Sequence, residues 1–157
     1  MIFDRIRSSV DVERMQDSTV LMVGGAYGLV GDLVRCGLGK VKLLDFDRVE
    51  DHNVGRTDFF QPDLGKHKIE AVAARLLQIN PELEIETYVA DYCTLTREDH
   101  DALCADVDLM TLATDFFPAQ ARGNAEAVRL GKSGLWIGLY KGGRAGEVIH
   151  HVPGLTP

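Results

Sequence analysis

Short apolar segments that alternate with helical patterns constrain the fold of this chain more than any other feature of its sequence. They lie at Thr19–Val23, Val41–Leu44, Leu109–Thr114 and Leu135–Tyr140. Their residues are apolar at consecutive rather than alternate positions, which is typical of strands buried between two helix layers. We therefore expect an α/β protein with a Rossmann-like, doubly wound, mostly parallel sheet and helices on both faces, a three-layer α/β/α arrangement.

The remaining segments fit this arrangement. Glu84–Ala90 alternates between apolar and polar residues, which predicts a strand near an edge of the sheet. Lys66–Ile79 carries apolar residues at helical spacing, which predicts a helix more clearly than in any other segment. Thr96 to Asp99 resembles a capped helix start, with the helix ending near Ala105, and Ala119–Leu130 predicts another helix. A last strand is expected within residues 143–152.

A glycine-rich loop follows the first apolar segment. It reads Gly24-Gly-Ala-Tyr-Gly28-Leu-Val-Gly31, and such loops present backbone N–H groups and a helix N-terminus to phosphate oxygens. The match to G-x-G-x-x-G is imperfect, because Ala26 stands where the motif ending at Gly31 would start. A tight strand-to-helix turn without a ligand is the alternative. Asp45, about 20 residues downstream, strengthens the nucleotide interpretation.

The loop after the second apolar segment brings together residues suited to a nucleotide. Asp45 ends that segment, and a carboxylate at this point suits the hydroxyls of a ribose. Asn53 and Arg56 follow closely, and the guanidinium of arginine is a planar fork of donors for phosphate oxygens. The alternatives are that Asp45 caps the strand and that Asn53 and Arg56 only shape a turn.

Composition excludes several classes of protein. The chain has 157 residues, which suits one domain, with 45% hydrophobic and 26% charged residues. Its net charge of −7 argues against nucleic acid as a partner. No apolar run approaches the roughly 20 residues of a membrane span, and no signal peptide is evident. Three scattered cysteines fit a reducing cytoplasm, so we expect a cytoplasmic protein without membrane contact.

An ordered series of motifs extends over most of the chain, from about Ser18 to Val152. It consists of Val20–Gly24, Gly37-Leu-Gly39, Leu44–Glu50, Asn53-Val-Gly-Arg56, Asp63–Lys68, Ile79-Asn-Pro81, Ala113-Thr-Asp115 with Arg122, and Gly142–Val148. With this series the chain resembles the ubiquitin-activating-type adenylyltransferase superfamily, which includes the ThiF, MoeB and HesA types.

This resemblance implies an ATP-dependent reaction. The C-terminal glycine carboxylate of a ubiquitin-like or sulfur-carrier protein ending in Gly-Gly would attack ATP, forming an acyl adenylate and releasing pyrophosphate. The implied cofactors are ATP and Mg²⁺, and a homodimer is expected. Asp115 would place the metal, and Arg56, Lys68 and Asp115 would serve catalysis. The implied nucleotide-binding residues are Gly24, Gly28, Asp45, Asn53, Arg56 and Lys68. Arg122 is expected to be structural.

Several departures from the family pattern leave alternatives open. The segment between Gly24 and Gly39 is about three residues shorter than the family norm, and paired Cys-x-x-Cys zinc motifs are missing. We interpret residues 1–157 as a single ATP-binding adenylation domain, either without a C-terminal portion or as a reduced family member. A non-catalytic module of the same fold that docks a partner is one alternative function. An NAD-binding dehydrogenase domain is the other, although it has no evident use for Arg56 and Lys68.

Overall fold

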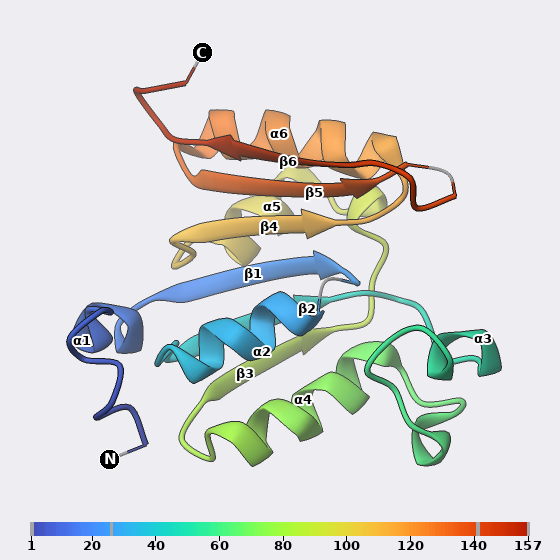
Figure 1. The fold of residues 1–157 in the computed structure, drawn as a ribbon. Coiled ribbons are helices and arrows are strands. Elements are labelled where there is room, and N and C mark those ends of the chain that lie inside the picture. Colours follow the sequence, from blue (N-terminus) through green and yellow to red (C-terminus); the bar gives the residue numbers. More distant parts are fainter. Residues whose placement is uncertain (1, 26, 141, 157) are drawn as a thin grey trace.

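A twisted sheet runs through the centre of the molecule (Figure 1). The computed structural model describes residues 2–25, 27–140 and 142–156. The strands are β1 (Thr19–Gly24), β2 (Lys40–Leu44), β3 (Glu84–Tyr88), β4 (Leu109–Ala113), β5 (Ser133–Leu139) and β6 (Gly146–His151). Their order in space is β3-β2-β1-β4-β5-β6, with β1 to β5 parallel and β6 antiparallel to β5. The expected mostly parallel sheet is confirmed, and Glu84–Tyr88 is indeed an edge strand.

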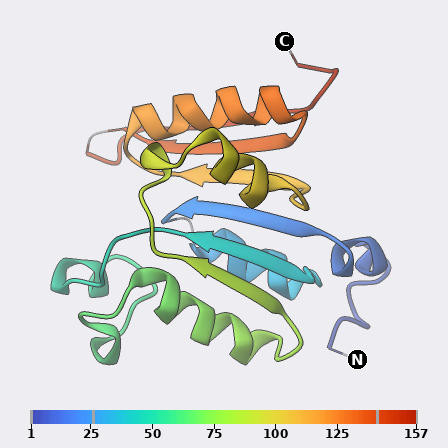
Figure 2. The same ribbon diagram turned by 180° about the vertical axis from the view of Figure 1, so that it is seen from behind.

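Helices cover both faces of the sheet. Figure 1 shows α2 and α4 in front of it, and the reverse view in Figure 2 brings α5 to the front. The helices are α1 (Val12–Gln16), α2 (Tyr27–Arg35), α3 (Asp51–Val54), α4 (Lys68–Ile79), α5 (Arg97–Cys104) and α6 (Phe117–Leu130), with short 3₁₀ turns η1 (Gln61–Asp63) and η2 (Tyr92–Thr94). The predicted three-layer α/β/α fold is thereby confirmed.

Two hydrophobic cores lie on either side of the sheet. Successive residues of a strand point to opposite faces, so Val20 and Met22 of β1 belong to the core under α2 and α4. Leu21 and Val23 belong to the core on the opposite face, together with residues of α5 and α6. Burial of both faces explains why the central strands are apolar at consecutive positions.

The N-terminal helix α1 is part of this packing. Val12 is completely buried, and the Gly39 N–H donates a 3.1 Å hydrogen bond to the carbonyl of Met15. A Cβ atom added at Gly39 would lie 1.8 Å from the carbonyl oxygen of Gln16, so only glycine allows the backbones to approach this closely.

Two helix starts differ from the sequence-based expectation. α4 begins at Lys68 rather than Lys66, because His67 is extended and pairs with Arg48 in an isolated bridge. α6 begins at Phe117 rather than Ala119, with Pro118 in the first turn, where a missing N–H costs nothing. Thr96 caps α5 as expected, accepting a hydrogen bond from the Asp99 N–H. In the described ranges, no helix is long and apolar enough to cross a membrane.

Candidate functional site

The register of the sheet brings three sequence motifs to one edge. Val23 of β1 is opposite Leu44 of β2, and Gly24 is opposite Ala113 of β4, so these parallel strands end together. Asp45 follows the end of β2 directly, and Asp115 is the second residue after the end of β4. Ligands of open α/β sheets bind at the carboxyl ends of the strands, and this edge is therefore the candidate site.

The glycine turn after β1 is required by packing. Gly24 has a φ of +81°, and a Cβ atom there would lie 2.7 Å from Thr114 Cγ2 and 2.9 Å from the carbonyl oxygen of Ala113. The Gly25 N–H donates a 3.0 Å hydrogen bond to the same carbonyl. Gly28 is less confined, because the nearest atom to a Cβ there would be Asp58 Oδ2 at 3.8 Å. Ala26, which breaks the glycine motif, lies outside the described residues.

The Asp45 carboxylate is nearly buried, with 9% of the residue exposed. Its Oδ1 accepts a 2.8 Å hydrogen bond from the Asp47 N–H, and its Oδ2 accepts a 2.8 Å bond from the Tyr27 hydroxyl. Burial, followed by the charge of Asp45, raises the pKa of Tyr27 far above its ordinary value, so the phenol keeps its proton and acts as a donor. The sequence analysis did not identify Tyr27 as a site residue, although a large side chain inside a glycine-rich loop was a signal that could have pointed to it.

Asn53 shapes the loop rather than lining an open site. It is 3% exposed, and its Oδ1 accepts a 2.9 Å hydrogen bond from the Glu50 N–H at the start of α3. Its carbonyl accepts hydrogen bonds from the N–H groups of Arg56 and Thr57. The predicted direct contact with phosphate would require this buried side chain to move, whereas its present contacts fix the backbone of Arg56.

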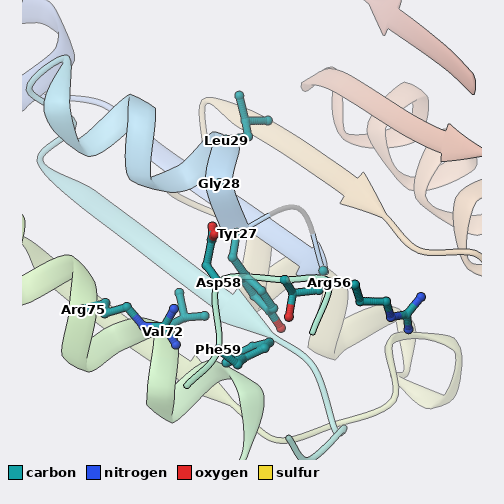
Figure 3. Close-up of a pocket in the computed structure, with 10 residues that line it drawn as sticks. Tyr27, Gly28, Leu29, Arg56, Asp58, Phe59, Val72 and Arg75 are labelled. Carbon is teal, nitrogen blue, oxygen red and sulfur yellow. The ribbon is translucent and has the colours of Figure 1, made fainter. Parts of the chain in front are cut away.

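The Arg56 side chain lies exposed at the rim of a cavity of about 340 Å³ (Figure 3). Within the described part of the chain, its guanidinium has neither a hydrogen bond nor an ion pair. The cavity also exposes Gly25 and Gly28 of the glycine turn, and Phe59 and Arg75 form another part of its wall. In Figure 3, Arg56 and Arg75 lie on opposite sides of Tyr27 and Phe59. The cavity thus brings the glycine turn and Arg56 together, as the sequence indicated.

Lys68, the first residue of α4, and Lys66, two residues before it, already have acidic partners. Lys68 Nζ lies 2.6 Å from Asp47 Oδ2, and Lys66 Nζ lies 3.4 Å from Asp63 Oδ1. Carboxylates of the protein therefore already lie beside both cations. Lys68 remains close to the candidate site, since Asp47 is also the residue whose N–H donates to Asp45.

Asp115 is exposed at the end of the segment that follows β4. Across residues 2–25, 27–140 and 142–156, its carboxylate has no hydrogen bond or ion pair, and the N-cap position of α6 is taken by Phe116. No group of three or more potential metal ligands occurs among those residues. A Mg²⁺ ion at Asp115 would therefore complete its oxygen ligands from phosphates and water.

Arg122 has structural contacts, as expected. Its two terminal nitrogens donate hydrogen bonds to the carbonyl oxygens of Cys93 and Leu95. These bonds fasten the segment around η2 to α6. That segment leads into a second cavity of about 240 Å³, which includes Leu44, Tyr88 and Leu95 in its mainly apolar wall. Leu44, at the end of β2, belongs to the core under α5 and α6, whereas Phe59 and Val72 belong to the core under α2 and α4, so the two cavities open on opposite faces of the sheet.

The fold and the strand-end residues define an α/β domain of the nucleotide-binding type, with a glycine turn, an acidic residue after β2 and a cationic loop. The whole chain, residues 1–157, matches the ThiF family, and the protein belongs to that family.

Relatives of known name agree with this assignment. The chain is 34% identical to ubiquitin-like modifier-activating enzyme 5 of Drosophila simulans, over 99% of this chain and 42% of that protein. It is 35% identical to the enzyme of the same name from Branchiostoma floridae, over 92% of this chain and 38% of that protein. The chain thus spans less than half the length of these relatives.

Solved structures share the fold. MccB of E. coli matches with a TM-score of 0.77 at 24% identity, over 92% of this chain and 44% of that chain. The tRNA N6-threonylcarbamoyladenosine dehydratase TcdA of E. coli matches with a TM-score of 0.76 at 23% identity, over 86% of this chain and 59% of that chain. This architecture is therefore common to proteins that act on quite different molecules.

Proposed function

We propose that this chain forms the ATP-binding part of an adenylyltransferase. The reaction would activate the C-terminal glycine carboxylate of a ubiquitin-like or sulfur-carrier protein as an acyl adenylate and release pyrophosphate. The observation that carries the proposal is the exposed Arg56 guanidinium, which has no partner among the described residues and shares a cavity with the glycine turn. A free guanidinium beside the N-terminus of α2 suits a polyphosphate.

The two cavities, both close to the carboxyl ends of parallel strands, support a particular placement of ATP. The cavity with Gly25, Gly28 and Arg56 offers donors and positive charge for the phosphates. The second cavity, with Leu44, Tyr88 and Leu95, offers apolar surface for the base. Asp45, which follows Leu44 at the end of β2, would accept hydrogen bonds from the ribose hydroxyls. Asn53 would act mainly by holding the Arg56 loop in place.

The available residue types are sufficient for this chemistry. A C-terminal carboxylate is already an anion at neutral pH, so no general base is needed to make it a nucleophile. The protein must instead position the reactants and offset the charge that develops on the phosphates. Arg56 and Lys68 would serve that purpose. Mg²⁺ held by Asp115 would supply further neutralisation of the phosphates.

The names of the relatives support the class of substrate. Ubiquitin-like modifier-activating enzyme 5 is named for acting on a ubiquitin-like protein, and the E. coli structures include MccB with MccA. We infer by family membership that the partner here is a small protein ending in Gly-Gly, that the assembly is a homodimer, and that the protein works in the cytoplasm.

A partner-docking module without catalysis is the second candidate. It is favoured by exposed apolar side chains around β6, with Leu139 77%, Val148 69% and Ile149 52% exposed. Such side chains along an edge strand suit a protein partner. This function would need no nucleotide, so nucleotide binding separates the two candidates.

The experiment is calorimetric titration of the wild-type chain with Mg-ATP and, separately, with NAD. We expect ATP to bind and NAD not to bind. Arg56→Ala should weaken ATP binding by at least about tenfold, since it removes a charged donor. Arg35→Ala, an exposed arginine in the last turn of α2 at the opposite end of that helix, is the matched control. Binding of NAD in place of ATP would favour the dehydrogenase interpretation, and binding of neither would favour the docking module.

A further inference from the structure

The Tyr27 hydroxyl occupies an acceptor that a bound nucleotide would need. Its bond to Asp45 Oδ2 is 2.8 Å long, and the other oxygen, Oδ1, is engaged by the Asp47 N–H. Only 9% of Asp45 is exposed. A ribose hydroxyl therefore cannot reach this carboxylate freely while Tyr27 keeps its present position.

The Tyr27 ring is supported from the side. It contacts Phe59 edge to face, with ring centroids 5.8 Å apart and an interplanar angle of 75°. Phe59 is itself 4% exposed and lies beneath the Arg75 guanidinium, whose central carbon is 5.1 Å from the ring centroid. Tyr27 is thus held in place in the wall of the cavity, with its hydroxyl donating to Asp45.

We propose that Tyr27 is a gate at the nucleotide site: its hydroxyl covers Asp45 in the nucleotide-free protein, and a ribose diol must displace it in order to bind. This inference rests on the proposed function, because it takes ATP as the ligand. The inference identifies Tyr27 as a residue that sets the affinity and the selectivity of the site for nucleotides. A nucleotide with a ribose diol binds only to the population in which Tyr27 has left Asp45, so its apparent affinity is lowered by that fraction.

If Tyr27 acts as a gate, two effects on nucleotide affinity are expected. Tyr27→Phe keeps the ring and its contact with Phe59 but removes the competing donor, so Mg-ATP should bind about tenfold more tightly than to wild type. The affinity for 2′,3′-dideoxy-ATP, which lacks the competing diol, should change little. Tyr92→Phe is the matched control, because the Tyr92 hydroxyl is buried and has no hydrogen-bond partner in the described structure.

A direct measurement follows Tyr27 itself in the wild-type chain. Protein labelled with 3-fluorotyrosine gives a ¹⁹F resonance for each tyrosine, and loss of one resonance in Tyr27→Phe assigns it. Addition of Mg-ATP should shift the Tyr27 resonance, whereas 2′,3′-dideoxy-ATP should shift it far less. This measurement does not depend on the stability of any other variant.

The outcomes separate the gate from the proposed function. If wild type and Tyr27→Phe bind Mg-ATP equally, or if the variant binds it less tightly, Tyr27 is not a gate, although the ATP site stands. If neither protein binds Mg-ATP, the proposed function fails and the gate fails with it. Tighter binding by Tyr27→Phe together with a shifted Tyr27 resonance would support both.

Discussion

Asp47 and Lys68 form a 2.6 Å ion pair that joins the loop after β2 to the first residue of α4. The same Asp47 donates its N–H to Asp45, so one residue connects the ribose acceptor to a cation proposed for phosphate binding. The side chains are 49% and 17% exposed respectively. The pair therefore contributes little to stability, and Lys68 is available to exchange one anion for another.

Replacement of Lys68 tests this exchange. Lys68→Ala should weaken Mg-ATP binding at least about tenfold, because a charged donor is lost. It should lower the free energy of unfolding by less than about 1 kcal/mol, as expected for a partly exposed ion pair. Calorimetric titration and urea unfolding measure the two effects. Lys66→Ala, which removes a similar pair with Asp63, should leave ATP affinity unchanged, and equal losses in both variants would contradict a specific role for Lys68.

Gly24 offers a test of the turn after β1. Gly24→Ala should lower the free energy of unfolding by about 2 kcal/mol or more, since its φ of +81° and its 2.7 Å approach to Thr114 Cγ2 exclude a side chain. The measurement is urea denaturation followed by circular dichroism. Gly25→Ala is the control, because a Cβ there meets nothing within 4 Å. Similar stability of Gly24→Ala and wild type would show that the turn can relax.

His100 should make stability depend on pH. It is completely buried in α5, neither ring nitrogen has a hydrogen-bond partner in the described residues, and its ring stacks edge to face on Tyr92 with centroids 4.6 Å apart. Burial lowers the pKa of His100 below 6.5, an effect that the Glu126 carboxylate opposes and the Arg122 and Arg129 guanidinium groups reinforce.

Proton uptake at His100 determines whether stability rises or falls with pH. Below about pH 6.5 the unfolded chain binds a proton at this histidine and the folded chain resists it, so stability falls as the pH is lowered. The fall from this one group is at most about 1.4 kcal/mol per pH unit. Urea unfolding between pH 5 and 8 should show a shallower pH dependence for His100→Phe. The exposed His150→Phe should retain the wild-type slope, and an unchanged slope in His100→Phe would contradict the assignment.

Asp106 neutralises a buried lysine. Lys42 is 4% exposed, and its ammonium donates to Asp106 Oδ1 at 2.5 Å and to the Leu103 carbonyl at 2.9 Å. Asp106→Asn should cost about 1–2 kcal/mol of unfolding free energy, less than a fully buried pair because Asp106 is half exposed. Glu84→Gln, at a more exposed partner of Lys40, should have a much smaller effect in the same urea titration.

The same pair predicts a response to acid. The hydrogen bond from Lys42, ahead of the opposing effect of burial, lowers the pKa of Asp106 to about 2. Its contribution to stability is present above pH 3.8 and is lost as the pH falls towards 2. Acid unfolding of Asp106→Asn should therefore show less pH dependence than wild type in that interval, and parallel curves would contradict the coupling.

Much of the fold could be predicted because its strands are buried on both faces. Consecutive apolar residues at Thr19–Val23 and alternation at Glu84–Tyr88 distinguished a central strand from an edge strand. The start of α4 was misplaced because the bridge between Arg48 and His67 depends on two segments distant in sequence. Such pairing leaves no periodic signal in either segment alone.

The site was predictable in its location but not in its internal contacts. Strand ends indicated where Asp45, Arg56 and Asp115 would lie, since parallel strands end at one edge. The hydrogen bond from Tyr27 to Asp45 joins the glycine loop to the next strand and could not be read from either motif. The cap that Asn53 provides for Glu50 was visible in principle, as a polar side chain three residues after a helix start.

The close approach of Gly39 to Gln16 determines where this domain can be cut. Any shortened version that begins at Thr19 would discard the completely buried Val12 and leave the Gly39 N–H without its carbonyl acceptor, Met15. Expression and fusion designs should therefore keep Val12–Gln16 attached, and new termini are better placed in the exposed residues 142–145 between β5 and β6.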